Sequence, residues 1–260
     1  MSYTFDFRID KGDKNTGTVY LPNESAKKLP VIIYCHGLGS DRQLNPSTKA
    51  LFDKVLSGAA IVTFDFYGGG ETGGDFRQMT YTRWKNNLAD ILDWVYEQNW
   101  ANKNKIGCFA FSSGTTAALR LAQEDNRLSF VISIATCIST NIGMGKGGPC
   151  KLLVDNLEGL LTGNTVEILG VDYGIDYYID TISNAPIYNM SKIKCPVYFL
   201  QGGSDNIYRR TDAKIGYELM QKNNLLSSYH EIANGNHELD NYPGECADKA
   251  INWLCEVGIL

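Results

Sequence analysis

The sequence predicts an α/β fold, with a mostly parallel central sheet and helices on both of its faces. Two observations predict this class. Short apolar runs, typical of buried parallel strands, alternate along the chain with longer segments whose apolar residues recur at helical spacing. Polar or glycine-rich loops follow these runs, at the points where ligands bind in such sheets. A chain of 260 residues can bury one core of this size.

The expected elements follow in order. The first part of the chain carries strands at 5–9, 16–21, 31–35 and 59–66 and helices at 46–56 and 82–98. Pro46 stands in the first turn of its helix and Gly58 follows the end, as start and stop signals do. The later part carries strands from 105, at 129–135, 196–200 and 228–232, and helices at 115–123, 212–222 and from 243.

Residues 136–190 interrupt this alternation. The segment is rich in glycine and asparagine and lies between two predicted core strands. Long insertions of this kind usually carry function. We therefore expect an α/β core made of residues 1–135 and 191–260, with 136–190 as an inserted cap subdomain.

Composition excludes several classes of protein. The net charge of −5 argues against nucleic-acid binding, and no apolar run reaches transmembrane length. The N-terminus lacks the basic and apolar regions of a signal peptide. The seven cysteines are dispersed and form no Cys-x-x-Cys pair, as expected of free thiols in a reducing compartment. We expect a cytoplasmic protein whose partner is a small molecule rather than a nucleic acid or a membrane; a homodimer stays possible.

The segment KIGCFAFSSGTTAALRL, residues 105–121, carries the strongest chemical signal. It reads as a buried strand, a tight turn and a helix, with a serine at the apex. This is the setting of a nucleophile elbow, whose usual pattern is Gly-x-Ser-x-Gly. Here the pattern is Ala110-Phe111-Ser112-Ser113-Gly114, so alanine replaces the first glycine.

A serine nucleophile needs a base, and the chain has three histidines. His230 lies inside a predicted strand, and His36 precedes a glycine turn, so we interpret both as structural. His237 lies on a loop past a strand end and has the reach that a base needs. Asp205 follows the predicted strand at 196–200 and would accept the imidazole Nδ1 hydrogen of His237. The other candidate aspartates lie in the cap or after the histidine: Asp172, Asp176, Asp180, Asp240 and Asp248.

Backbone amides would stabilise the oxyanion of the reaction. The residue after the nucleophile, Ser113, supplies one donor. A loop after an early strand supplies the other, which indicates the amide of Leu38.

The sequence predicts no cofactor and no metal. Gly68 to Gly73 matches Gly-x-Gly-x-x-Gly, but the next helix begins only near Thr82, whereas a dinucleotide site needs a helix that opens on the phosphate. No cluster of side chains has the spacing of metal ligands.

Several motifs together resemble the α/β-hydrolases, and within them the bacterial cinnamoyl (feruloyl) esterases. The motifs are VIIYCHGLGS from Val31, DFYGGGETGGDF from Asp65, Met79-Thr80, the serine turn, APIY from Ala185, QGGSD ending at Asp205 and GNH ending at His237. The order Ser, Asp, His is that of the superfamily. The resemblance implies that Ser112 is the nucleophile, Asp205 the acid and His237 the base, with Leu38 and Ser113 forming the oxyanion hole.

The resemblance also implies that a small cap covers an acyl pocket and that aromatic or acidic cap residues meet the phenolic end of the substrate. Asp172, Tyr173 and Tyr177 are candidates in the cap, and His36 and Phe111 are candidates in the core. The family's elbow reads Gly-His-Ser-Gln-Gly, so Phe111 replaces a polar side chain here. This difference from the family bears on which substrate the chain accepts.

These observations predict a serine carboxylesterase that hydrolyses small or aromatic, cinnamoyl- or feruloyl-type, acyl esters through an acyl-enzyme. The alternatives are a thioesterase, a lipase or a peptidase of the same fold, or a catalytically silent binding protein.

Overall fold

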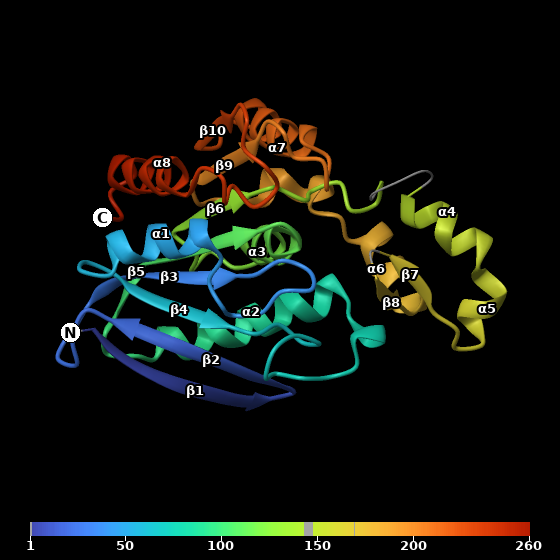
Figure 1. Cartoon of the computed structure of the whole chain (residues 1–260), viewed down its shortest axis with the longest axis horizontal. Coiled ribbons are helices and arrows are strands. Elements are labelled where there is room, and N and C mark those ends of the chain that lie inside the picture. Colours follow the sequence, from blue (N-terminus) through green and yellow to red (C-terminus); the bar gives the residue numbers. More distant parts are fainter. Residues whose placement is uncertain (1, 143–147, 169) are drawn as a thin grey trace.

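The computed structural model describes residues 2–142, 148–168 and 170–260. Within them, eight strands form one sheet in the order β1-β2-β4-β3-β5-β6-β9-β10 (Figure 1). The strands are β1 (Tyr3–Lys11), β2 (Asp13–Leu21), β3 (Leu29–Cys35), β4 (Ala60–Phe64), β5 (Ala101–Phe111), β6 (Phe130–Ile134), β9 (Val197–Gly202) and β10 (Ser227–Ile232). Strand β2 is antiparallel to both of its neighbours, and all other pairs are parallel. The predicted fold class is therefore confirmed.

Helices cover both faces of the sheet because the side chains of the central strands alternate between them. In β3, Val31 and Ile33 belong to the core cluster of one face, while Ile32 and Tyr34 belong to that of the other. The first face carries α2 (Tyr81–Tyr96), α3 (Ser113–Ala122) and α7 (Thr211–Lys222), and the second carries α1 (Pro46–Val55) and α8 (Pro243–Glu256).

The first two strands are longer than predicted. They form one antiparallel hairpin whose turn is Gly12, at φ 81°. Strand β1 lies at the edge of the sheet and is mostly exposed. Its ends carry polar residues, so the sequence pattern does not indicate its full length.

The turn between β5 and α3 requires two special backbone positions. Ser112 has φ 50° and ψ −124°, a backbone conformation that residues other than glycine rarely adopt. A Cβ at Gly114 would overlap the carbonyl oxygens of Cys35 and His36, so glycine is needed for the close approach of α3 to the end of β3. Ala110 is fully buried in the same cluster as the small residues Ala117 and Ala118, and its methyl group fits there.

The elements between β6 and β9 do not join the large sheet. They are α4 (Gly148–Asp155), α5 (Leu157–Leu161), the hairpin of β7 (Val166–Ile168) and β8 (Val171–Tyr173), α6 (Ile175–Ser183) and η2 (Pro186–Lys192). Helices α4 to α6 and the hairpin lie beyond the carboxyl ends of the parallel strands, away from both termini (Figure 1). We infer that they form the cap predicted at 136–190, of which residues 143–147 and 169 lie outside the described residues.

A buried ion pair attaches this cap to the core. Asp180 of α6 accepts hydrogen bonds from Thr82 N at 3.0 Å and Arg120 Nη1 at 3.2 Å, and also from the Thr82 hydroxyl. The Asp180 and Arg120 side chains are 9% and 7% exposed. Helix α6 is thereby fixed to the first turn of α2 and to α3, the helix that follows Ser112.

All seven cysteines are free, and only Cys150 and Cys255 are exposed. Across residues 2–142, 148–168 and 170–260, no helix combines the length and the apolar character needed to span a membrane.

The cap attachment predicts a large loss of stability on Asp180→Ala. The substitution leaves the Arg120 guanidinium buried without its partner, so the free energy of unfolding should fall by about 3–5 kcal/mol, measured by urea denaturation. The matched control is Asp53→Ala, which removes an exposed i,i+4 pair with Lys49 and should cost less than about 0.5 kcal/mol. Equal losses in the two variants would contradict this account.

Candidate active site

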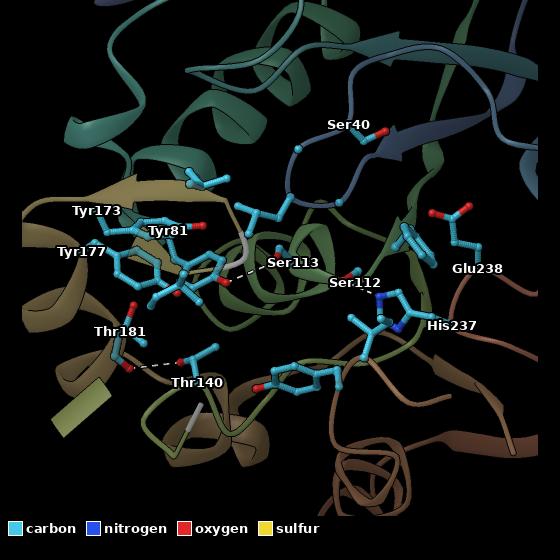
Figure 2. A pocket seen from close by; sticks show the side chains of 18 of the residues that line it. Ser40, Tyr81, Ser112, Ser113, Thr140, Tyr173, Tyr177, Thr181, His237 and Glu238 are labelled. Carbon is cyan, nitrogen blue, oxygen red and sulfur yellow. Dashed lines mark hydrogen bonds between the residues drawn. The ribbon is translucent and has the colours of Figure 1, made fainter. Parts of the chain in front are cut away.

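Three side chains that are far apart in the sequence meet at the carboxyl edge of the sheet. His237 Nε2 lies 2.9 Å from Ser112 Oγ, and His237 Nδ1 lies 2.8 Å from Asp205 Oδ2. Ser112 stands at the turn after β5, Asp205 follows β9 and His237 follows β10. Figure 2 shows the Ser112 hydroxyl facing the imidazole ring. The geometry is that of a nucleophile, a base and the group that orients the base.

The surroundings of Asp205 keep it ionised. Its Oδ1 accepts hydrogen bonds from the amides of Ile207 at 2.9 Å and Tyr208 at 3.2 Å, and its Oδ2 accepts one from Gln201 Nε2 at 3.0 Å. Burial alone raises the pKa of Asp205, but the hydrogen bond and charge of His237 and the two amides outweigh burial, so the pKa lies below its usual value. The carboxylate can only accept, so His237 donates from Nδ1 and its Nε2 is left to accept from the Ser112 hydroxyl.

Main-chain hydrogen bonds hold the Ser112 backbone on both sides. Its N–H donates to Ile134 O of β6 at 2.9 Å, and its carbonyl oxygen accepts from Thr115 N at 2.9 Å and Thr115 Oγ1 at 2.6 Å. The hydroxyl makes no capping hydrogen bond to α3. It therefore projects above the helix start, where His237 meets it.

Two backbone amides next to the hydroxyl are available as donors. Within the described residues, neither Leu38 N nor Ser113 N donates to a protein acceptor. Ser113 N is the first amide of α3, where a helix has no internal acceptor and favours negative charge. Their assignment as the oxyanion hole stays a prediction, and this arrangement agrees with it.

Buried polar side chains support the loop that carries Leu38. His36 Nε2 accepts from Phe66 N at 3.0 Å, and His36 Nδ1 donates to Gly37 O at 2.8 Å. Burial lowers the pKa of His36, which keeps the ring neutral, as the accepting nitrogen requires. Further along the loop, buried Asp65 accepts from Arg42 N at 2.7 Å and pairs with the Arg42 guanidinium.

A cavity of about 390 Å³ opens in front of Ser112, between the core and the cap. Leu152, Ile168, Val171, Tyr173, Tyr177 and Thr181 line it from the cap. From the core it is lined by residues 37–40 of the loop after β3, called the oxyanion loop after its predicted role, by Phe111, Ser112 and His237, and by Tyr81 and Tyr208; Thr140, in the segment predicted as the cap, also lines it. Of the five candidate pocket residues, the structure brings Phe111, Tyr173 and Tyr177 to this cavity.

The prediction that His36 and Asp172 line the pocket is wrong. His36 is 1% exposed and lies behind the oxyanion loop, with its ring against Phe66 and Trp84. Asp172 is exposed on the outer side of the β7–β8 hairpin, where it accepts from Thr165 Oγ1 at 3.1 Å. Alternation along β8 turns Tyr173 inward and therefore Asp172 outward.

Sequence reasoning missed several hydroxyl groups of the cavity. The Tyr81 hydroxyl donates to Ser113 Oγ at 3.3 Å, and Thr140 Oγ1 donates to Thr181 O at 3.1 Å (Figure 2). The hydroxyls of Tyr173, Thr181 and Tyr208 are buried and have no partner in the described part of the chain. Burial raises the pKa values of Tyr173 and Tyr208, so both phenols stay protonated and can donate. The abundance of tyrosine, fifteen residues, was the available signal.

No group of three or more His, Cys, Asp or Glu side chains in the described ranges could hold a metal ion. The polar side chains that line the cavity are hydroxyls, the His237 imidazole, the Asn45 amide and the Glu238 carboxylate.

The chain has recognisable relatives. A protein of Escherichia coli described as an uncharacterized 31.7 kDa protein in the traX-finO intergenic region is 22% identical over 224 residues, 74% of this chain and 78% of that protein. The esterase Est1E of Butyrivibrio proteoclasticus with ferulic acid bound superposes with a TM-score of 0.81 at 16% identity, covering 96% of this chain and 98% of that one. The acylaminoacyl peptidase of Pyrococcus horikoshii superposes with a TM-score of 0.71 at 14% identity, covering 98% of this chain and 41% of that one.

These structures share the α/β-hydrolase fold with the chain, and at such identities they show the fold alone. Residues 11–161 match the X-Pro dipeptidyl-peptidase (S15) family, a stretch of more than half of the chain that includes Ser112. The chain belongs to the X-Pro dipeptidyl-peptidase (S15) family and is a serine hydrolase of the α/β-hydrolase fold.

Proposed function

We propose that the protein is a serine carboxylesterase that hydrolyses esters of small aromatic acids bearing a polar ring substituent. One observation carries the proposal. The Ser112–His237–Asp205 arrangement opens onto a cavity whose far end is lined by aromatic rings and uncharged hydroxyls. An ester needs only a nucleophile, a base and an oxyanion site, and the chain has candidates for all three.

The proposed reaction begins when His237 Nε2 takes the proton of Ser112 Oγ as the oxygen attacks the ester carbonyl carbon. The amides of Leu38 and Ser113 would stabilise the negative oxygen of the tetrahedral intermediate. His237 then gives the proton to the departing alcohol oxygen, which leaves an acyl group on Ser112. Water, deprotonated by His237, releases the acid and restores the serine. Ionised Asp205 stabilises the imidazolium in both steps.

The direction of proton transfer orients the substrate in the cavity. His237 must reach the leaving oxygen, so the alcohol lies on the His237 side of Ser112 and the acyl group on the other side. That other side contains Tyr81, Tyr173, Tyr177 and Thr181 (Figure 2). The rings of Tyr173 and Tyr177, with centroids 4.0 Å apart, offer aromatic surface to an aromatic acyl group.

Unpartnered hydroxyls favour a polar substituent on that group. A buried hydroxyl without a partner costs about 1–3 kcal/mol, and three residues that line the cavity carry such hydroxyls: Tyr173, Thr181 and Tyr208. An acid with a phenolic or methoxy oxygen would supply partners, whereas a plain hydrocarbon acid would not. The ferulic acid in Est1E, a protein of the same fold, is an acid of this kind.

The family name favours a second candidate, cleavage after an X-Pro dipeptide. A dipeptidyl-peptidase must hold the ammonium group of the substrate's N-terminus at the acyl end of its site, for which a carboxylate is the natural partner. Among the described residues that line the cavity, the only carboxylate is Glu238, which stands beside His237 at the other end (Figure 2). This charge distribution favours the esterase.

Ser112→Ala should lower kcat/KM for a p-nitrophenyl ester by more than about a thousandfold, because the nucleophile is lost while the fold is kept. A serine-reactive fluorophosphonate should label the wild-type protein and not the variant. Ser25→Ala, an exposed serine outside the cavity, is the matched control and should behave as wild type. Wild-type protein that neither reacts with the probe nor hydrolyses any ester would support a silent binding protein instead.

Substrate class is tested by comparing methyl ferulate, a short-chain acyl ester, an acyl thioester and glycyl-prolyl-p-nitroanilide. We expect methyl ferulate to give the highest kcat/KM and the dipeptide anilide to give no measurable turnover, since the acyl end lacks a carboxylate for the ammonium group. Efficient release of p-nitroaniline would refute the esterase assignment in favour of the peptidase.

Tyr173→Phe should lower kcat/KM for a 4-hydroxycinnamate ester about tenfold while changing the unsubstituted cinnamate ester much less, because only the first substrate uses the lost hydroxyl. Tyr3→Phe, which removes an exposed hydroxyl far from the cavity, is the matched control. The same loss for both esters would show that Tyr173 only shapes the cavity.

A further inference from the structure

Glu238 is the one acidic side chain among the described residues that line the cavity, and no lysine or arginine of the described chain lines it. The other lining groups are hydroxyls, aromatic rings, aliphatic side chains, the Asn45 amide and the imidazole of His237. A single carboxylate in such surroundings sets the sign of the local potential.

The place of Glu238 in the cavity assigns it to the alcohol half of the substrate. It directly follows His237, which would protonate the departing oxygen. In Figure 2 the Glu238 carboxylate stands beside the imidazole ring, with Ser112 between it and the cluster of Tyr173, Tyr177 and Thr181. The alcohol that receives its proton from His237 would therefore lie near Glu238, whereas the acyl group would lie on the other side of Ser112.

Neighbouring charges strengthen the negative potential there. Burial is the main cause that raises the pKa of Tyr34 to about 12, and the charges of Cys35, Glu238 and Asp41 contribute in the same direction. Tyr34 itself lines the cavity. Arg42, which follows the lining residues 37–40 in the sequence, pairs with Asp65 and Glu71.

We propose that Glu238 is a specificity-determining residue that selects esters whose alcohol carries a positive charge, such as a quaternary or primary ammonium group, and rejects alcohols that carry a carboxylate. The inference rests on the proposed esterase function. It names the leaving-group half of the substrate, whereas the tyrosines of the cap concern the acyl half. Glu238 is exposed on one side, so a cationic leaving group can keep part of its hydration while it contacts the carboxylate.

The test uses three esters of one aromatic acid. The choline ester is cationic, the 3,3-dimethylbutyl ester is its neutral isostere, and the glycolate ester is anionic. Wild-type protein should prefer the choline ester to the neutral ester, and Glu238→Gln should reduce this ratio of kcat/KM values about five- to tenfold at low salt. High salt should weaken the preference of the wild type.

A gain of activity separates charge selection from structural damage. Glu238→Gln should raise kcat/KM for the glycolate ester, and Glu238→Lys should prefer it to the choline ester. Glu256→Gln, which removes an exposed carboxylate at the end of α8, outside the cavity, is the matched control and should leave all ratios as in wild type.

The outcomes distinguish this inference from the proposed function. Hydrolysis of all three esters with ratios that Glu238→Gln does not change would overturn the role of Glu238 and leave the esterase standing. No hydrolysis of any ester, together with no labelling of Ser112 by a fluorophosphonate, would overturn the esterase and with it this inference.

Discussion

The site depends on one constraint, the left-handed backbone of Ser112 between β5 and α3. A non-glycine residue in such a conformation costs on the order of 1–3 kcal/mol and persists only where its neighbours hold it. Here the hydrogen bond from Ser112 N to Ile134 O, the close approach at Gly114 and the packing of α3 on the sheet hold it. The strained turn places the hydroxyl toward His237 and is followed directly by Ser113, the first residue of α3.

Two ion pairs of the core and the cap lie outside the cavity, whereas neutral hydroxyl-bearing residues line one end of it. Two ion pairs with a buried carboxylate involve residues that do not line the cavity: Asp65 with Arg42 supports the oxyanion loop, and Asp180 with Arg120 fixes the cap. The acyl end of the cavity is lined by neutral groups. In the proposed esterase, such an acyl end would discriminate between acyl groups by hydrogen bonding rather than by charge.

The sequence predicted the site residues that follow strand ends. It did not predict which other side chains face the cavity. Ser112, Asp205 and His237 could be found because each follows a predicted strand, and the carboxyl ends of parallel strands share one edge. Tyr81 and Tyr208 were missed because one begins a helix and the other lies in a loop, and neither belongs to a motif. Asp172 was misplaced because the facing of a short hairpin depends on its register, which the sequence leaves open by one residue.

The family match covers one part of the cavity lining and leaves the other part outside it. The matched residues, 11–161, contain the elbow and the oxyanion loop. Tyr173, Tyr177, Thr181, Tyr208 and Glu238, which define the two ends of the cavity, all follow them in the sequence. The matched stretch therefore contains Ser112 and its strained turn, while the residues that we propose to choose the substrate lie mostly in the cap hairpin, in α6 and in the loops after β9 and β10. A peptidase family name is compatible with an esterase for this reason: both reactions need the same elbow, and the residues that would distinguish an ammonium group from a phenol lie beyond the shared segment.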